Sequence, residues 1–193
     1  MDPASKDILI IGGANGAGKT TAARVLLRDY YNLHALLNAD EIARQISPQH
    51  PEAVSWAAGR VLIERMLRLV ETEESFAFET TCAGKTNLKL LERCRQNGWR
   101  ISLFYLWLPS PEMAEARVAR RVREGGHNIP VEVTHRRYFA GIRNMRDLYL
   151  PLADTAAIYD NSDQRRILIA EKESGLQLRV HDAGRWSRIE ELT

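Results

Sequence analysis

The feature that most constrains this chain is a glycine-rich stretch between a short apolar run and a pattern typical of a helix. Residues 13–20 read Gly-Ala-Asn-Gly-Ala-Gly-Lys-Thr and fit the pattern G-x-x-x-x-G-K-[ST]. They follow the apolar residues 8–11 and precede residues 21–27, which favour a helix. In this context the pattern marks the loop that surrounds the phosphates of a nucleoside triphosphate with backbone N–H groups. An ordinary glycine-rich turn is the alternative, and the flanking strand and helix favour the nucleotide-binding loop.

Each residue type in this loop has a physical reason. Gly13 and Gly18 permit positive φ angles and let the backbone approach phosphate oxygens that a Cβ atom would obstruct. The following helix adds unpaired N–H groups and the positive end of its dipole. Lys19 supplies a charge for the β- and γ-phosphates, and the Thr20 hydroxyl is placed to bind Mg²⁺. We therefore expect the nucleotide to contact Gly13, Ala14, Asn15, Gly16, Ala17, Gly18, Lys19, Thr20 and Thr21, with Thr20 as the metal ligand.

The size and composition of the chain limit its class. A chain of 193 residues is long enough for one α/β domain and too short for two ordinary domains, so we expect a single domain over residues 1–193. The formal net charge of +2 favours neither a nucleic-acid coat nor a membrane-surface protein. Cys82 and Cys94 lack metal-ligand spacing and suit free thiols in a reducing compartment. No apolar run has the length of a signal-peptide core or a membrane span, so we expect a cytoplasmic protein with no membrane partner.

Short apolar runs alternate with helical patterns along the chain, which predicts a sheet of mainly parallel strands. Strands are expected at residues 7–11, 33–37, 75–81, 100–108 and 155–159. Right-handed crossovers between them predict a doubly wound α/β fold of the P-loop kinase type, with a five-stranded sheet flanked by helices. Residues 166–170 and 178–181 predict a C-terminal β-hairpin, followed by a tail, within about 163–193.

Two acidic residues follow predicted strands, at the edge where open α/β sheets bind their ligands. Two carboxylates beside a triphosphate indicate phosphoryl transfer, which needs a group to deprotonate the acceptor. Asp40 is the first candidate for this base, and the alternative is that it caps the helix beginning there. Glu79 is expected to hold Mg²⁺ through water, to bind acceptor hydroxyls, or to be merely solvated. Arg60 and Thr80 complete the expected acceptor site.

The segment Arg117–Arg146 holds eight arginines against Glu124 and Glu132. Two helices joined at Gly125-Gly126 are typical of a lid, which we expect over about 112–147. A solvated face accounts for most of these arginines, but a kinase also needs cations near the transferred phosphoryl group. The candidates are Arg121 and Arg137 as catalytic cations, Arg136 as a substrate contact, and Arg117 as a nucleotide contact that stacks on adenine.

Loops and tryptophans add further candidates. His127 is expected to touch phosphate or substrate, or to form a local hydrogen bond. Asp160-Asn161-Ser162 is placed to line an adenine pocket, and an ordinary turn is the alternative. The tryptophans at positions 56, 99, 107 and 186 are expected in the core or partly buried.

Five segments carry a family resemblance: GGANGAGKTT, NADEIA, SFAFETT, SPEMAEARVARRVREGGHNIPVEVTHRRY and YDNS. In this order and spacing, over roughly residues 8–170, they resemble the small branch of the zeta toxin family of P-loop kinases. The resemblance implies a bacterial small-molecule kinase that uses ATP or GTP and is often the toxic half of a toxin–antitoxin pair. Characterised members phosphorylate UDP-amino sugars such as UDP-N-acetylglucosamine. A UDP-sugar acceptor and an antitoxin partner are therefore implied here.

The resemblance also implies roles for particular residues. Lys19 and Thr20 match the phosphate and Mg²⁺ positions, and Asp40 matches the general base. Glu79 matches the acidic acceptor-binding position, and arginines of RVARRV and HRRY match the lid cations. Larger toxins carry additional segments that shape the sugar site and engage the antitoxin. Short members are also described as ABC-type ATPases, but this chain has no L-S-G-G-Q signature.

Two other functions stay open at this point. One is a kinase that acts on a nucleoside or a nucleic-acid end, because the arginines of Arg117–Arg146 could follow a phosphate backbone. The other is a nucleotide-dependent regulator with little transfer activity. Our expectation is a kinase that moves the γ-phosphoryl group of ATP to a hydroxyl of a small acceptor, without nucleic acid as a partner.

Overall fold

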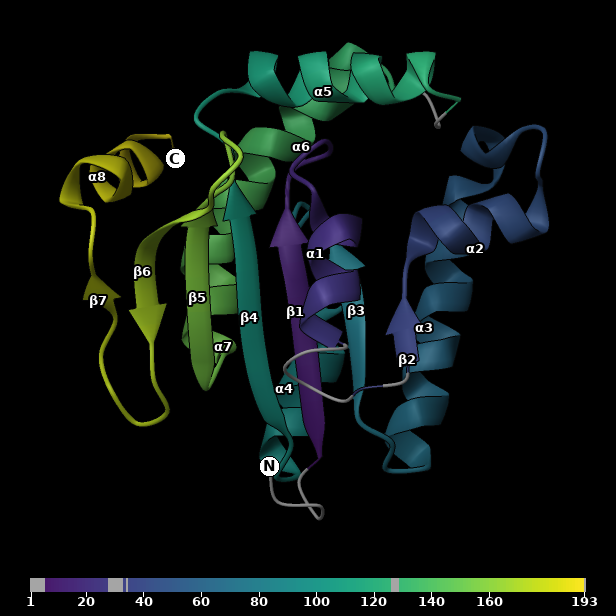
Figure 1. The fold of residues 1–193 in the computed structure, drawn as a ribbon. Coiled ribbons are helices and arrows are strands. Elements are labelled where there is room, and N and C mark those ends of the chain that lie inside the picture. The colour runs from purple at the N-terminus through teal and green to yellow at the C-terminus, as the bar shows by residue number, and fades with distance from the viewer. Residues whose placement is uncertain (1–5, 28–32, 34, 126–128, 193) are drawn as a thin grey trace.

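The computed structural model describes residues 6–27, 33, 35–125 and 129–192, within which seven strands form one sheet. Their order across the sheet is β2-β3-β1-β4-β5-β6-β7 (Figure 1). β1 to β5 run parallel, whereas β6 and β7 are each antiparallel to the preceding strand. The strands are β1 (Asp7–Gly13), β2 (Ala35–Leu37), β3 (Phe76–Thr80), β4 (Arg100–Trp107), β5 (Thr155–Asp160), β6 (Ile167–Lys172) and β7 (Arg179–Val180).

This topology confirms the predicted doubly wound, mainly parallel α/β fold. The sheet, however, has seven strands among the described residues instead of the predicted five. The five predicted strands are the parallel ones. The predicted hairpin continues the same sheet, because β6 pairs with β5, for example at Ala170 and Ile158. It thereby covers the backbone groups that β5 would otherwise leave unpaired at an edge.

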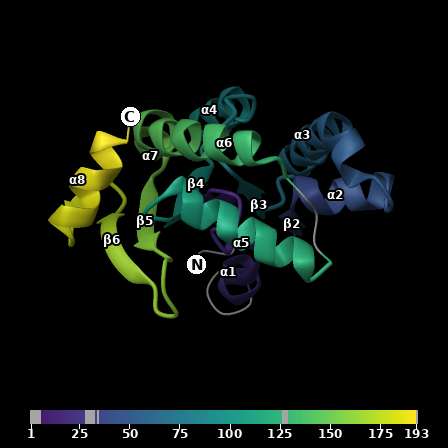
Figure 2. The ribbon, with the colours of Figure 1, turned by 90° about the horizontal axis from the view of Figure 1, so that it is seen from above.

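Helices cover both faces of this sheet. Figure 2 shows α4, α6 and α7 on one face and α1 on the other, while α5 crosses above the carboxyl ends of the strands. Among the described residues, no helix combines the length and apolarity that a membrane span requires. The helices are α1 (Lys19–Leu26), α2 (Ala39–Ile46), the 3₁₀-helix η2 (Pro51–Val54), α3 (Ser55–Glu71), α4 (Leu88–Gln96), α5 (Pro111–Arg123), α6 (Val131–Asn144), the π-helix η3 (Met145–Tyr149), α7 (Leu150–Leu152) and α8 (Ala183–Glu191).

The central strand β1 fixes the position of the glycine-rich loop. All of its residues are buried, including Asp7, whose carboxylate lies 2.6 Å from Arg100 Nε. Burial along the whole strand follows from its central place, since β3 and β4 flank it and helices cover both faces. β1 ends at Gly13, so the loop begins directly from a strand that is buried along its whole length.

The second predicted lid helix, α6, is anchored in the core over its carboxyl-terminal half. Tyr138 Oη donates a 2.7 Å hydrogen bond to a carbonyl oxygen just after β4. Asn144 Nδ2 donates to the carbonyl oxygen of Cys82 at 2.9 Å. At Gly141, a Cβ atom would lie only 2.3 Å from the carbonyl oxygen of Thr81. α6 therefore packs directly on the loop that follows β3.

The tail expected after the hairpin contains a helix, α8. Asp182 is its N-cap, and its side chain accepts a 2.9 Å hydrogen bond from the backbone N–H of Arg185. Ile189 is completely buried, which docks the helix on the core. A capping aspartate before a short helix was the available sequence signal for this element.

Candidate active site

The loop between β1 and α1 has the backbone shape that phosphate binding requires. Gly13 and Gly18 have φ angles of +143° and +88°, which residues with a side chain rarely adopt. A Cβ atom on Gly13 would lie 2.5 Å from the carbonyl oxygen of Leu106. Gly18 is the N-cap of α1, and it has no side chain that could accept a hydrogen bond from the first N–H groups of the helix. The first N–H groups of the helix therefore stay available to an anion.

Lys19 places its ammonium group inside this loop. Its Nζ donates hydrogen bonds to the carbonyl oxygens of Gly13, at 2.8 Å, and Ala14, at 2.9 Å. Burial lowers the pKa of Lys19, because it disfavours the charged form, while the carboxylates of Glu79 and Asp40 oppose this effect. The two acids that the sequence selected are therefore close enough to act on the charge of this lysine.

Thr20 and Glu79 form a polar pair beside the loop. Thr20 Oγ1 donates to Glu79 Oε2 at 3.0 Å. Glu79 is only 7% exposed, and its Oε1 has no hydrogen-bond partner among the described residues. A buried carboxylate oxygen without a partner is costly unless a cation or donor meets it. A hydroxyl and a carboxylate beside a triphosphate are ligands that suit Mg²⁺, so these residues fit the predicted ion.

Asp40 does not use its carboxylate to cap α2. Asn38 is the N-cap, because its Oδ1 accepts from the backbone N–H groups of Asp40, at 2.8 Å, and Glu41, at 3.2 Å. Asp40 itself is exposed and lines the cavity beside the loop. Of the two predicted roles for Asp40, the capping role therefore falls to Asn38.

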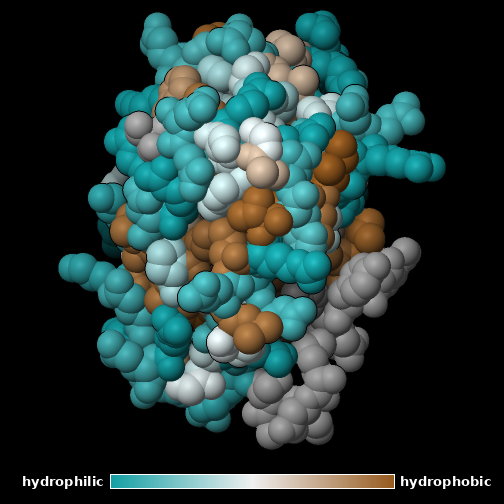
Figure 3. All heavy atoms as spheres, turned by 90° about the vertical axis from the view of Figure 1, so that its left-hand side faces the viewer, coloured by the Kyte–Doolittle hydropathy of each residue, from teal (hydrophilic) through white to brown (hydrophobic). Residues whose placement is uncertain are grey.

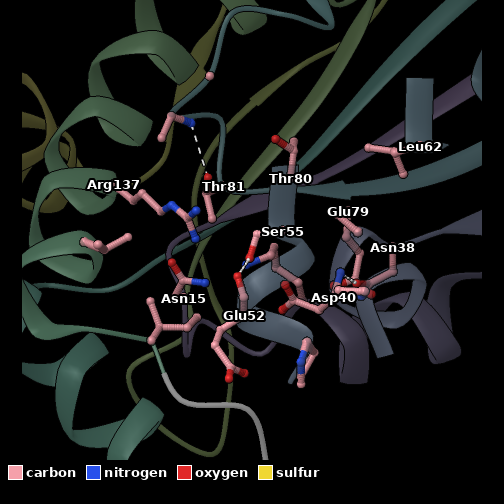
Figure 4. Close-up of a pocket in the computed structure, with 18 of the residues that line it drawn as sticks. Asn15, Asn38, Asp40, Glu52, Ser55, Leu62, Glu79, Thr80, Thr81 and Arg137 are labelled. Carbon is pink, nitrogen blue, oxygen red and sulfur yellow. Dashed lines mark hydrogen bonds between the residues drawn. The ribbon is translucent and has the colours of Figure 1, made fainter. Parts of the chain in front are cut away.

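A cavity of about 750 Å³ joins the predicted catalytic and acceptor residues. Figure 4 shows Asn38, Asp40 and Glu79 on one side of the view, and Asn15 and Arg137 on the other. Asn15 comes from the phosphate loop, and its buried Oδ1 has no partner among the described residues. The lining includes Asn15, Lys19, Asn38, Asp40, Glu52, Ser55, Leu62, Glu79, Thr80, Thr81, Arg136 and Arg137.

Arg60 lies outside this cavity but lines a smaller hollow of about 450 Å³ next to it. The two spaces share Thr80, Gly84 and other lining residues. The guanidinium of Arg60 lies 5.2 Å from the ring centroid of Trp56, which is 76% exposed. The expectation that the tryptophans are core or partly buried is thus wrong for Trp56. The sequence signal for this exposed position is Arg60, four residues further along, because residues with this spacing lie on the same face of a helix.

The predicted lid arginines separate into different environments. Arg121 lies near enough to Lys19 to lower its pKa further, and Arg136 and Arg137 line the main cavity. Arg117 donates instead to the backbone carbonyls of Asn161, at 2.8 Å, and Ser162, at 2.7 Å.

The prediction for His127 falls outside the described residues. Of the remaining loop positions, Thr21 is exposed on α1 and Ala17 is buried.

These features define a class of protein. A mainly parallel sheet carries a glycine-rich phosphate loop at the end of its central strand. The Thr20–Glu79 pair lies beside this loop, and Asp40 lines the adjoining cavity. This is the arrangement of the P-loop kinase fold. The zeta toxin family model matches residues 1–173, and the chain belongs to the zeta toxin family.

Comparison with known proteins agrees with this assignment. An uncharacterized protein of Haemophilus influenzae is 30% identical over 128 residues, covering 65% of this chain and 88% of the relative. A structure from the PezAT toxin–antitoxin system of Streptococcus pneumoniae is similar with a TM-score of 0.68 and 18% identity. That similarity covers 99% of this chain and 79% of the other.

The complex of AvrRxo1-ORF1 and ORF2 with ATP has a higher TM-score of 0.76, at 15% identity. The similar region covers 97% of this chain but only 64% of the AvrRxo1 chain, so this chain spans less than two thirds of that relative. At these identities, the solved structures establish the fold that the chain shares with them.

Proposed function

We propose that this protein is a kinase that transfers the γ-phosphoryl group of a nucleoside triphosphate, ATP or GTP, to a hydroxyl of a small acceptor. The observation that carries the proposal is one cavity lined by Lys19, Asp40 and Glu79, with Thr20 hydrogen-bonded to Glu79 beside it. Membership of the zeta toxin family supports it. The ATP named for the AvrRxo1 complex supports the choice of ATP.

The residues of the loop would bind and orient the triphosphate. The backbone N–H groups of residues 13–20 and the Lys19 ammonium group would hold the phosphates. Thr20 and Glu79 would hold Mg²⁺, which when bound neutralises charge on the β- and γ-phosphates. Asp40 would accept the proton of the acceptor hydroxyl. The hydroxyl oxygen of the acceptor would then bond to the γ-phosphorus, while the bond between the γ-phosphorus and the oxygen of the nucleoside diphosphate breaks. The products are the phosphorylated acceptor and the diphosphate.

Cations of the lid would stabilise the charge of the transferred group. Arg121 and Arg137 are the proposed catalytic cations, and Arg136 the substrate contact. Since α6 is anchored through Tyr138 and Asn144, the closing movement is proposed for α5. The whole chain over residues 1–193 would act as a single kinase domain.

The proposed acceptor is a UDP-amino sugar such as UDP-N-acetylglucosamine. A cavity of about 750 Å³ has the size of known small-molecule sites. The adjoining hollow adds Trp56, whose exposed ring can stack on a planar base, and Arg60, whose charge suits a phosphate. An antitoxin partner, as in the toxin–antitoxin system named for the PezAT structure, and a cytoplasmic location belong to the same proposal.

A nucleic-acid end is the alternative acceptor, and several arginines weaken it. Arg117 is committed to backbone carbonyls. Arg146 bonds to Asp147, and Arg120 lies 3.9 Å from Glu124. With these charges engaged within the protein, less of the segment is left to follow a phosphate backbone.

The test is transfer of labelled phosphate from Mg²⁺–ATP to a panel of UDP-sugars, nucleosides and RNA ends. The proposal predicts transfer that depends on a UDP-amino sugar and is lost in Lys19→Ala, which also weakens ATP binding. Transfer to RNA ends alone would replace the acceptor assignment. ATP binding without transfer to any acceptor would favour the nucleotide-dependent regulator.

A further inference from the structure

The last element of the chain lies beyond the part that the family model matches. That match ends at residue 173, whereas β7 and α8 follow it. Figure 1 shows α8 at the level of the carboxyl ends of β4 and β5, the edge that carries the phosphate loop. Seen from the α8 side, the surface is mainly hydrophilic with small hydrophobic patches (Figure 3).

Arg185 joins α8 to the tip of β5. Its Nε lies 2.7 Å from Oδ2 of Asp160, the last residue of β5, and its Nη1 lies 2.5 Å from Oδ2 of Asp182. The Asp160 side chain is only 4% exposed. Its other oxygen accepts from the backbone N–H of Ser162 at 2.8 Å. Burial alone would raise the pKa of Asp160, but the hydrogen bonds from Arg185 and Ser162 outweigh it and lower the pKa.

The residues after Asp160 connect this ion pair to the phosphate loop. Asn161 Nδ2 donates to the carbonyl oxygen of Ala17, within the loop, at 2.8 Å. The backbone N–H of Asn161 donates to the carbonyl oxygen of Trp107 at 3.0 Å. Arg117, from α5, donates to two backbone carbonyl oxygens of the same turn. A chain of direct contacts therefore leads from α8 through Asp160 and Asn161 to the nucleotide-binding backbone.

A second contact joins α8 to the connection between β4 and α5. Arg188 Nη2 donates to the carbonyl oxygen of Pro109 at 3.2 Å, and its guanidinium lies 5.4 Å from the Trp107 ring centroid. Pro109 lies between β4 and α5, next to the serine that caps α5. α8 thus contacts both the end of β5 and the connection between β4 and α5.

We propose that α8 is a clamp on this turn, and that Arg185, acting through Asp160, is a positioning residue for nucleotide binding. The inference rests on the proposed function, because it assumes that the base of the triphosphate lies against residues 160–162. A turn that is already held in place before binding loses less conformational entropy when the nucleotide binds. Without Arg185, the buried Asp160 carboxylate loses its cation and the turn moves to reach water. Asp40 and Glu79 lie on other elements, so the chemical step is spared.

The experiment measures the Kd of ATP by calorimetry, and KM and kcat with Mg²⁺–ATP, for the full chain. Arg185→Ala is expected to raise Kd and KM for ATP about tenfold, the effect of losing one charge-assisted hydrogen bond, with kcat within about twofold of the parent. Arg185→Lys keeps the charge and is expected to restore part of the affinity. Arg179→Ala is the matched control, since Arg179 is an exposed arginine of the same C-terminal segment, and parent values are expected.

A double-mutant cycle tests whether Arg185 acts through Asp160. Asp160→Asn is expected to weaken ATP binding, and adding Arg185→Ala to it is expected to weaken binding no further. Equal ATP affinity in the parent, Arg185→Ala and Arg185→Lys would overturn the clamp and leave the kinase proposal intact. A fall in kcat with unchanged KM would also overturn it. A parent chain that binds neither ATP nor GTP would overturn both proposals.

Discussion

The hydroxyl of Thr20, at the end of the phosphate loop, lies 3.0 Å from Oε2 of Glu79, at the carboxyl end of a neighbouring strand. The register of the sheet produces this contact, because Ile11 of β1 pairs with Glu79 of β3. A position 59 residues away in sequence is thereby fixed beside the loop. In the proposed kinase, this pair would hold Mg²⁺.

Replacing Glu79 tests that inference. Glu79→Gln keeps the shape and can still accept from Thr20, but it removes the negative charge that favours a divalent cation. We expect the Mg²⁺ concentration for half-maximal transfer to rise about 10- to 100-fold, the range seen when groups around a metal are altered. A Mg²⁺ titration of transfer activity measures it, with the exposed Glu92→Gln as control. An unchanged Mg²⁺ requirement would remove Glu79 from the ion site.

The cap of α2 should control stability near Asp40. Asn38→Ala removes the acceptor of two backbone N–H groups, and we expect it to lower the free energy of unfolding by about 1 kcal/mol. Asn38→Ser retains a capping oxygen and should recover most of this loss. Urea denaturation measures both. Equal stabilities for the alanine and serine variants would contradict the capping role.

Two helical glycines should respond in opposite ways to alanine. At Gly141 in α6, the added Cβ would lie 2.3 Å from Thr81 O, and we expect a loss of about 1–3 kcal/mol in unfolding free energy. At Gly59 in α3, no described atom beyond the neighbouring residues and the local helix backbone lies within 4 Å of the added Cβ, and we expect a gain of about 0.5–1 kcal/mol. Thermal and urea unfolding of the two variants compare them. A harmless Gly141→Ala would show that α6 is not fixed against the loop after β3.

Asp160 should make stability depend on acid pH. Its pKa is lowered in the folded protein, so its stabilising effect is complete above the unfolded value of about 4 and is lost as the pH falls through the folded value. The parent should therefore exceed Asp160→Asn in stability at pH 7, and the difference should shrink below pH 4. Unfolding curves across this range test it, with the exposed Asp163→Asn as control. A difference independent of pH would contradict the ion pair with Arg185.

The parts of the site that the sequence predicted are those encoded locally. The phosphate loop was recognisable because its glycines, lysine and threonine are contiguous, and the parallel strands because their apolar runs are continuous. The role of Asp40 stayed open because Asn38 and Asp40, two positions apart, are both residue types that cap helices. The partners of Arg117 lie 44 and 45 residues further along the chain, and no local pattern reports such contacts.

The C-terminal region shows the same limit. The hairpin was predicted from two short strand-like segments, but its joining of the main sheet depends on an edge that only the folded chain presents. α8 was missed because it is short, and because its stability comes from burying Ile189 and from the Arg185–Asp160 pair, both tertiary contacts.

The most direct test of the account is the rate of phosphate transfer in Asp40→Asn, measured beside its affinity for Mg²⁺–ATP. The variant keeps the size of the side chain and leaves the phosphate loop and the Asn38 cap in place, but it cannot take a proton from the acceptor. The account predicts parent-like ATP affinity with transfer reduced about 10²- to 10⁴-fold. Transfer at the parent rate would show that Asp40 is not the base.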